Sequence, residues 1–181
     1  MTHIVRQTRE TAIDLRVSIG DAAAEIRTSE PFLDHMLATL ARYGGLNLAV
    51  TASGDLRHHL IEDVAITLGT ALRDEVPATC RRYGHAVVPM DDALVEAAVD
   101  AGGRPYYAGR LPSALYEHFF RSLADHAGWT LHLRVIRGRD RHHIVEACFK
   151  ALGLALRQAM AEGGVVFSTK GAVRVRREEQ A

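Results

Sequence analysis

Two short clusters in this chain combine the side chains that proteins often use to bind transition metals. The first is His58-His59-Leu-Ile-Glu62, and the second, His142-His143-Ile-Val-Glu146, has the same order of two histidines and a glutamate. If each cluster lies on a helix, the first histidine and the glutamate are four residues apart and share a face, so both can bind one ion. The second histidine points about 100° away and is better placed to reach a different ion.

The similarity between the two clusters extends along the chain. Residues 58–74 align with residues 142–158, and 8 of the 17 aligned positions are identical, including a glycine at positions 69 and 153. Upstream, Asp34-His35 aligns with Glu117-His118, which adds a third histidine to each copy. We therefore interpret the chain as two half-units that arose by internal duplication and fold as one domain.

Together the two copies offer six imidazoles and two carboxylates. This set is too rich for one tetrahedral zinc ion and suits two octahedral ions of the manganese, iron or cobalt kind. A lone histidine on an apolar helix is more often a hydrogen-bonded core residue than a ligand, but the duplication favours metal binding. The predicted ligands are His35, His58, His59, Glu62, His118, His142, His143 and Glu146. The other histidines have no duplicated counterpart and are interpreted as surface or strand residues: His3, His85, His126 and His132.

The pattern of apolar residues predicts the order strand, strand, helix, strand, helix in each half. Alternation indicates strands at residues 12–19 and 24–27, and Pro31 opens a helix that ends at Gly44-Gly45. A strand over residues 46–51 and a long helix carrying the first cluster complete this half. In the second half, the corresponding elements are expected at residues 93–99, 115–124, 131–136 and 143–161.

This order predicts an α+β fold with helices packed on a mixed, largely antiparallel sheet. We expect residues 1–181 to form a single domain made of internal repeats at about residues 6–80 and 86–171. The stretch from Cys80 to Asp92 then only connects the halves, and residues 174–181 form a charged C-terminal tail.

Composition restricts the possible partners. The 22 basic and 22 acidic side chains cancel, so no general field attracts nucleic acid or a membrane surface. No apolar run approaches the roughly 20 residues that span a bilayer, and the N-terminus lacks the apolar core of a signal peptide, so we expect a cytoplasmic protein. Cys80 and Cys148 are isolated thiols, which we interpret as packing residues.

Several segments resemble one known enzyme family in their order and spacing. They are Phe32-Leu-Asp-His-Met36, His58-His-Leu-Ile-Glu-Asp-Val64, Glu117-His-Phe-Phe-Arg121, His142-His-Ile-Val-Glu-Ala147 and Ser168-Thr-Lys-Gly171. The family is imidazoleglycerol-phosphate dehydratase, and the resemblance runs from about Arg6 to Gly171. The expected fold accordingly resembles that of the ribosomal protein S5 domain 2.

The resemblance implies a hydro-lyase of histidine biosynthesis that converts imidazoleglycerol phosphate to imidazoleacetol phosphate with two manganese ions per subunit. The family's metal ligands fall on the eight residues that duplication and helix geometry select. Glu10 matches a substrate-contacting glutamate whose role would be proton transfer. Further residues match positions that bind the substrate, chiefly its phosphate: Arg82, Arg104, Ser168 and Lys170. Arg81 is an alternative to Arg82.

The expected chemistry begins at the imidazole ring of the substrate, because the carbon proton to be lost is only weakly acidic. A metal-bound ring can ionise to imidazolate, expel hydroxide from the attached carbon and form a diazafulvene-like intermediate. A carboxylate then removes the carbon proton, and the resulting enol tautomerises to the ketone. Glu10 is the candidate base, while Glu62 and Glu146 belong to the catalytic centre as ligands.

A single chain offers little surface to cover such a site. The resemblance implies a homo-oligomer of twenty-four subunits built from trimers, with metal sites between subunits. A non-catalytic metal-binding or assembly protein is an alternative, which would share the metal ligands but would not need Glu10, Arg104 or Lys170. A nucleic-acid-binding protein is disfavoured by the zero net charge and the aromatic content of 6%.

Overall fold

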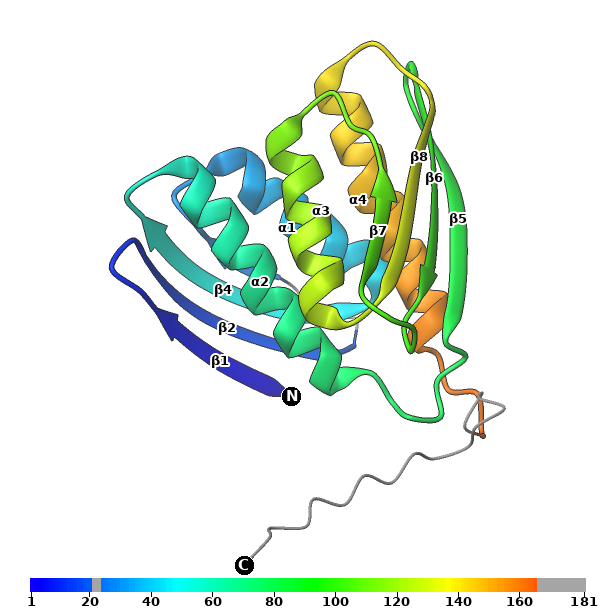
Figure 1. Cartoon of the computed structure of the whole chain (residues 1–181), viewed down its shortest axis with the longest axis horizontal. Coiled ribbons are helices and arrows are strands. Elements are labelled where there is room, and N and C mark those ends of the chain that lie inside the picture. Colours follow the sequence, from blue (N-terminus) through cyan, green and yellow to red (C-terminus); the bar gives the residue numbers. More distant parts are fainter. Residues whose placement is uncertain (21–23, 166–181) are drawn as a thin grey trace, which may run out of the picture.

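The two halves of the chain fold in the same way (Figure 1). The computed structural model describes residues 1–20 and 24–165. The first half contains β1 (Thr2–Gln7), β2 (Thr11–Ile19), β3 (Glu25–Arg27), α1 (Pro31–Gly44), β4 (Leu46–Gly54) and α2 (Arg57–Glu75). The second half contains β5 (Tyr83–Met90), β6 (Ala93–Asp100), β7 (Tyr106–Gly109), α3 (Ala114–Ala127), β8 (Thr130–Arg137) and α4 (Arg141–Met160). No helix within these described residues is long and apolar enough to cross a membrane.

Each half builds its own four-stranded sheet, so the α+β fold predicted from the sequence is confirmed, with two mixed sheets in place of one. The strand orders are β1-β2-β4-β3 and β5-β6-β8-β7. The first three strands of each order are antiparallel, and the last strand runs parallel to its neighbour. The four helices lie between the two sheets (Figure 1), which places the apolar core at the centre of the molecule.

The predicted order of elements is confirmed, with a further strand at the start of each half. One of these strands, β5, occupies most of the stretch from Cys80 to Asp92, so the interpretation of this stretch as a simple connection is wrong. Its sequence hides the strand because only Gly84 and Val88 are buried along it and because Pro89 cannot donate a backbone hydrogen bond. The proline is tolerated since β5 lies at the edge of its sheet.

The helices pair across the two halves. α1 packs against α4, and α3 packs against α2. The duplicated glycines lie at these crossings: a Cβ atom on Gly153 would lie 2.8 Å from Cβ of Tyr43, and one on Gly69 would lie 2.6 Å from the carbonyl oxygen of Leu123. A hydrogen in place of a side chain therefore permits both pairs of helices to approach closely.

All four helices begin at the same end of the molecule, the upper end in Figure 1. A duplicated acidic residue fixes how the chain enters α1 and α3. Asp34 accepts a hydrogen bond from the backbone N–H of Thr28 at 2.9 Å, and Glu117 accepts one from that of Leu111 at 3.0 Å. Each preceding loop is thereby tied to the first turn of its helix, immediately beside the histidine that follows the acidic residue.

We predict that Gly153→Ala and Gly69→Ala each lower the free energy of unfolding by about 1–3 kcal/mol, because the new methyl group overpacks the helix crossing. Alanine favours a helix interior over glycine by about 1 kcal/mol, so a net loss must come from the contact. Urea denaturation of the metal-free protein measures the effect. Thr70→Ala, at an exposed position beside Gly69, is the control and should not destabilise the protein. Unchanged stability in both glycine variants would contradict the proposed role of the crossings.

Candidate metal centre

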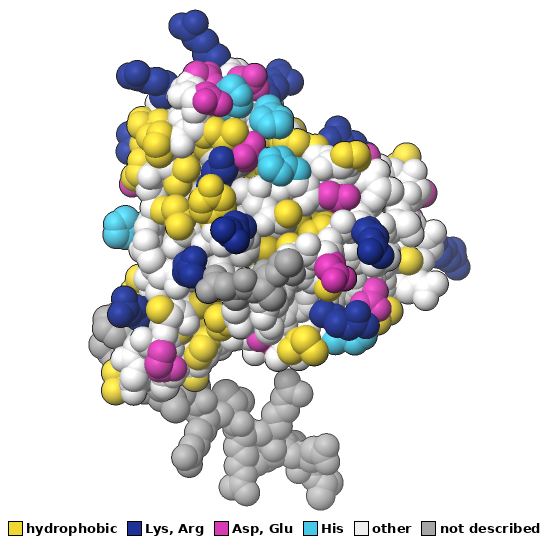
Figure 2. Space-filling view, turned by 180° about the vertical axis from the view of Figure 1, so that it is seen from behind, with side chains coloured by type: hydrophobic (Ala, Val, Ile, Leu, Met, Phe, Trp, Pro, Cys, Tyr) yellow, Lys and Arg dark blue, Asp and Glu magenta, His cyan; other side chains and the backbone are white. Residues whose placement is uncertain are grey.

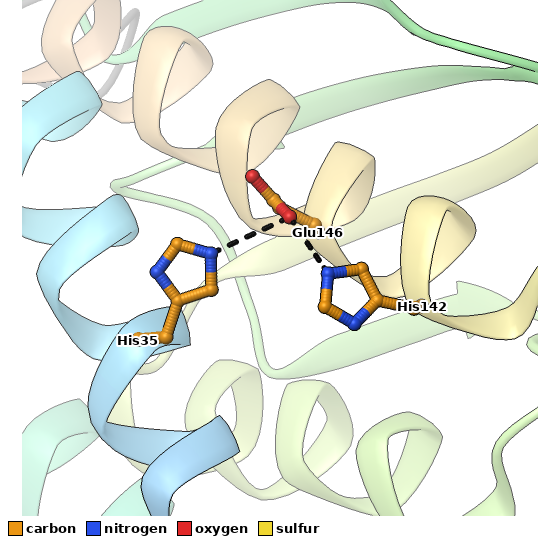
Figure 3. A group of neighbouring side chains, drawn as sticks. All are labelled: His35, His142 and Glu146. Carbon is orange, nitrogen blue, oxygen red and sulfur yellow. Dashed lines mark ion pairs between the residues drawn. The ribbon is translucent and has the colours of Figure 1, made fainter.

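The cluster around the second motif joins the two halves of the chain (Figure 3). His142 and Glu146 lie one turn apart on α4, and His35 reaches them from α1. The Nε2 atoms of His142 and His35 lie 3.2 and 3.4 Å from Oε2 of Glu146. The side chain of Glu146 is 8% exposed, whereas those of the histidines are 53% and 51% exposed. The cluster thus combines a protected carboxylate with a side that is open to a further ligand.

The cluster around the first motif has the same composition, but here the first half supplies the histidine and glutamate of the motif and the second half supplies the third ligand. His58 and Glu62 lie one turn apart on α2, and His118 reaches them from α3. Nε2 of His58 lies 3.4 Å from Oε2 of Glu62, and Nε2 of His118 lies 3.0 Å from Oε1 of the same residue. The sequence left open which third histidine completes each cluster. In the structure the third histidine of each cluster comes from the half that does not carry the motif. The reason is that α1 packs against α4 and α3 packs against α2.

Both clusters fit a divalent transition metal. Their ligand atoms lie within 4.8 Å of one another. Two ligands bound to one ion at about 2.1 Å and about 90° apart are separated by about 3 Å, close to the distances found here. Among the described residues, Nε2 of His118 makes no hydrogen bond of regular geometry, and its polar neighbour is the carboxylate of Glu62 at 3.0 Å. Two imidazoles and one carboxylate fill about half of an octahedral shell and leave the rest for other ligands.

The second histidine of each motif lies outside both clusters and is held by an aspartate. Nδ1 of His59 donates to Oδ1 of Asp55 at 2.8 Å, and Nδ1 of His143 donates to Oδ1 of Asp92 at 2.7 Å. The bond from His143, together with those from the backbone N–H groups of Arg139 and Asp140, lowers the pKa of Asp92 to about 2. Asp55 lies four residues before its histidine, a spacing that could have revealed it. Asp92 lies in the turn between β5 and β6, and only the fold brings it to its histidine.

Glu146 has a cationic neighbour that the sequence did not point to. Nζ of Lys150, one helical turn later, lies 2.9 Å from Oε1 of Glu146. Burial opposes ionisation of this carboxyl group, but the contacts with Lys150 and His35 outweigh it and lower the pKa of Glu146 below its ordinary value. The aligned position in the first half is Ile66, so the two clusters differ in their surrounding charge.

Glu10 lies beside the first motif, in the turn between β1 and β2. Its Oε2 atom lies 3.6 Å from Nδ1 of His59, and its side chain is 55% exposed. The backbone carbonyl of Glu10 accepts a hydrogen bond from the N–H of Asp55 at 3.0 Å, which ties the turn to the start of α2. The structure therefore places this carboxylate next to one of the predicted ligands and leaves it open to solvent.

Two predicted phosphate-binding residues lie at the opposite end of the helices. Arg82 binds both carboxylate oxygens of Asp100, at 2.6 and 3.0 Å, and borders a cavity of about 480 Å³ at the last turn of α2 and the end of α3. Arg104 lies between Gly103 and Pro105, which line the same cavity. Because α2 has 19 residues and is therefore about 28 Å long, this end is remote from both clusters. One chain does not bring the two groups together.

The remaining predictions concern Ser168 and Lys170, the C-terminal tail, and the histidines without a duplicated counterpart. Ser168, Lys170 and the tail over residues 174–181 lie outside the described residues. Of the histidines without a duplicated counterpart, His3, His85 and His132 lie in strands, and His126 donates from Nδ1 to the carbonyl oxygen of Ser122 at 2.9 Å. Figure 2 shows histidine side chains together with acidic ones at the upper end of the molecule.

The fold and the site define a class of protein: a duplicated α+β protein with two centres, each of two histidines and one glutamate, suited to divalent transition metals. The sequence profile of the imidazoleglycerol-phosphate dehydratase family matches residues 28–156. The chain therefore belongs to the imidazoleglycerol-phosphate dehydratase family, whose members are hydro-lyases of histidine biosynthesis, and the resemblance stated from the sequence is confirmed.

Similar proteins cover almost the whole chain. The imidazoleglycerol-phosphate dehydratase of Halorhodospira halophila is 47% identical and covers 94% of this chain and 96% of its own length. That of Methanoculleus marisnigri is also 47% identical, with 95% and 98% covered. The crystal structure of the dehydratase from Pyrococcus furiosus is 43% identical in sequence, has a TM-score of 0.84, and covers 94% of this chain and 100% of its own. The crystal structure of the dehydratase from Staphylococcus aureus is 33% identical, has a TM-score of 0.81, and covers 88% of this chain and 98% of its own.

We predict that His118→Ala removes about half of the bound metal, because it takes one of the three protein ligands from the cluster of His58 and Glu62 and none from the cluster of His142 and Glu146. Metal per chain, measured by elemental analysis after equilibrium dialysis against manganese, tests this. His126→Ala, which removes a histidine from the same helix outside the cluster, should leave the metal content unchanged. Full metal content in His118→Ala would exclude His118 as a ligand.

Proposed function

We propose that this protein catalyses the manganese-dependent dehydration of imidazoleglycerol phosphate to imidazoleacetol phosphate. The observation that carries the proposal is the pair of matched clusters, His35–His142–Glu146 and His58–Glu62–His118, in a chain of this family. Each cluster presents three ligand atoms to one ion, which supports two ions per subunit. The remaining coordination positions are then available to the substrate and to histidines of neighbouring subunits.

The clusters and Glu10 divide the chemistry between them. Bound divalent ions would supply the Lewis acidity that ionises the imidazole ring and helps to expel the hydroxyl group from the carbon attached to it. Glu62 and Glu146 would hold such ions as carboxylate ligands. The Oε2 atom of Glu10 takes the proton from the neighbouring carbon, and the enol that results becomes the ketone by tautomerisation. Its place beside His59 supports this role.

The phosphate group requires residues from the other end of a subunit. Arg104 and Arg82 are our candidates, with Ser168 and Lys170 added by the resemblance alone. A guanidinium group suits the oxygens of a phosphate, to which it can donate two parallel hydrogen bonds. In Arg82, Nε and Nη2 already donate to Asp100, so this residue would have to share its donors with the phosphate. Because these arginines and the clusters of one chain lie about a helix length apart, we propose that the complete site lies between subunits of an assembly of twenty-four chains built from trimers.

The decisive experiment measures turnover of imidazoleglycerol phosphate by the purified protein, first treated with a chelator and then reloaded with manganese. We expect activity only after reloading. Glu10→Gln should lower kcat by about 10²–10⁴-fold, because a general base is lost, and should leave the metal content unchanged. Glu25→Gln, on the exposed strand β3, should behave as the wild type. Tight binding of two ions per chain without turnover would instead support a metal-binding or assembly protein.

Assembly is expected to depend on metal. The open coordination positions of each cluster, and the second histidines that lie outside both clusters, predict that ions link subunits. Light scattering after size exclusion should show a large assembly of the manganese-loaded protein and a smaller species after chelation. A monomer in both states would refute the composite site. A large assembly that survives chelation would show that protein contacts alone hold it together.

A further inference from the structure

Two aspartates outside the metal clusters make the same contact in the two halves. Asp55 accepts a hydrogen bond from Nδ1 of His59, and Asp92 accepts one from Nδ1 of His143. An ionised carboxylate can only accept, so Nδ1 must carry the hydrogen in both imidazoles. In a neutral imidazole the lone pair is then on Nε2. Each aspartate thus selects the tautomer in which Nε2 can bind a metal.

The two halves reach this contact by different routes. Asp55 lies on the loop before α2, and the residue aligned with it in the second half is Arg139. The equivalent carboxylate there comes from Asp92, in the turn between β5 and β6. Its other oxygen, Oδ2, accepts the backbone N–H groups of Arg139 and Asp140 at 2.6 and 3.1 Å, which hold it against the start of α4. Nδ1 of the equivalent histidine is therefore bound by an aspartate in both halves, although the two aspartates do not occupy equivalent positions in the sequence.

The orientation of the rings separates these histidines from their neighbours. The rings of His58 and His59 are inclined by 80° with centroids 6.3 Å apart, and those of His142 and His143 by 89° with centroids 5.9 Å apart. Because adjacent residues on a helix point about 100° apart, the two imidazoles of each pair do not easily bind the same ion. The first histidine of each pair contacts the glutamate of its cluster. The second contacts neither cluster: Nδ1 of His59 lies 3.6 Å from Glu10, and Nε2 of His143 lies 3.4 Å from Oδ2 of Asp91.

We propose that Asp55 and Asp92 are positioning residues that orient His59 and His143 as Nε2 ligands for ions held by the clusters of neighbouring subunits. The inference rests on the proposed function, since it requires these histidines to bind metal. Both aspartates act through an imidazole and do not contact the ion. Their loss should therefore weaken metal binding while all eight predicted ligands stay in place.

The test compares manganese affinity in Asp55→Asn, Asp92→Asn and the wild type, measured from the electron paramagnetic resonance signal of free Mn²⁺ in a titration of the full-length protein. Asparagine keeps the size of the side chain and one acceptor oxygen, but it can also rotate to donate to Nδ1 and select the wrong tautomer. We expect each variant to weaken binding by about 10–100-fold. Asp74→Asn, an exposed carboxylate at the far end of α2, is the matched control and should bind as the wild type.

Two further measurements separate positioning from simple charge. A titration repeated in about 1 M salt, where the Debye length is about 3 Å, screens the exposed charges, and the loss of affinity should persist. At saturating manganese, kcat of both variants should approach that of the wild type, because the ligands are intact. Circular dichroism of the metal-free variants verifies folding, and the two variants lie in different halves, so either one alone can test the proposal.

The outcomes distinguish this inference from the proposed function. Unchanged affinity in both variants, or a loss that disappears in high salt, would overturn the positioning role even if the wild type turns over the substrate. Weakened affinity in variants of a protein that shows no turnover would support the positioning role for metal binding and refute the dehydratase proposal. Weakened affinity that is independent of salt, with kcat restored by saturating metal, supports both.

Discussion

The close crossing of helices from opposite halves is the constraint on which the metal centre depends. A histidine and a glutamate one turn apart can be supplied by any helix, but the third ligand of each cluster is on a different helix and in the other half. It arrives only because α1 lies against α4 and α3 against α2. Gly153 and Gly69 keep these crossings close, and the acidic residue before each third histidine ties its helix to the loop that enters it. One packing geometry, used twice, therefore builds two centres.

Much of the fold and half of each cluster could be predicted from the sequence, because both depend on short periodic spacings. The helical spacing of His58 and Glu62 predicts a shared face without any knowledge of the fold. The partner of that pair could not be predicted in this way, since His35 and His118 stand at nearly equal distances before the two motifs. β5 escaped notice because most of it is exposed and an edge strand needs little apolar patterning. The hydrogen bond between Asp92 and His143 could not be predicted either, because Asp92 lies in the turn that follows this strand.

Duplication did not make the two clusters equivalent. Glu146 is nearly buried and forms an ion pair with Lys150 through Oε1. The side chain of Glu62 is 33% exposed, and the residue aligned with the lysine is Ile66. The lysine neutralises part of the charge that would attract a cation, but it also fixes the carboxylate and keeps it ionised. Burial strengthens whatever electrostatic interaction remains. The two centres therefore present the same ligand atoms in different local electrostatic fields.

The electrostatics of the helix ends argues independently for a site shared between subunits. All four helices direct their N-termini, which carry partial positive charge, at the end where the cations would bind. The glutamates of the clusters and the aspartates bound to His59 and His143 offset that unfavourable field. The same helix ends favour an anion, and a phosphate bound near them would gain from the helices of one subunit and from the arginines of another. Within one chain these two sources of positive charge lie at opposite ends of the helices. In the assembly that we propose, contact between the upper end of one subunit and the lower end of the next would bring them to the same substrate.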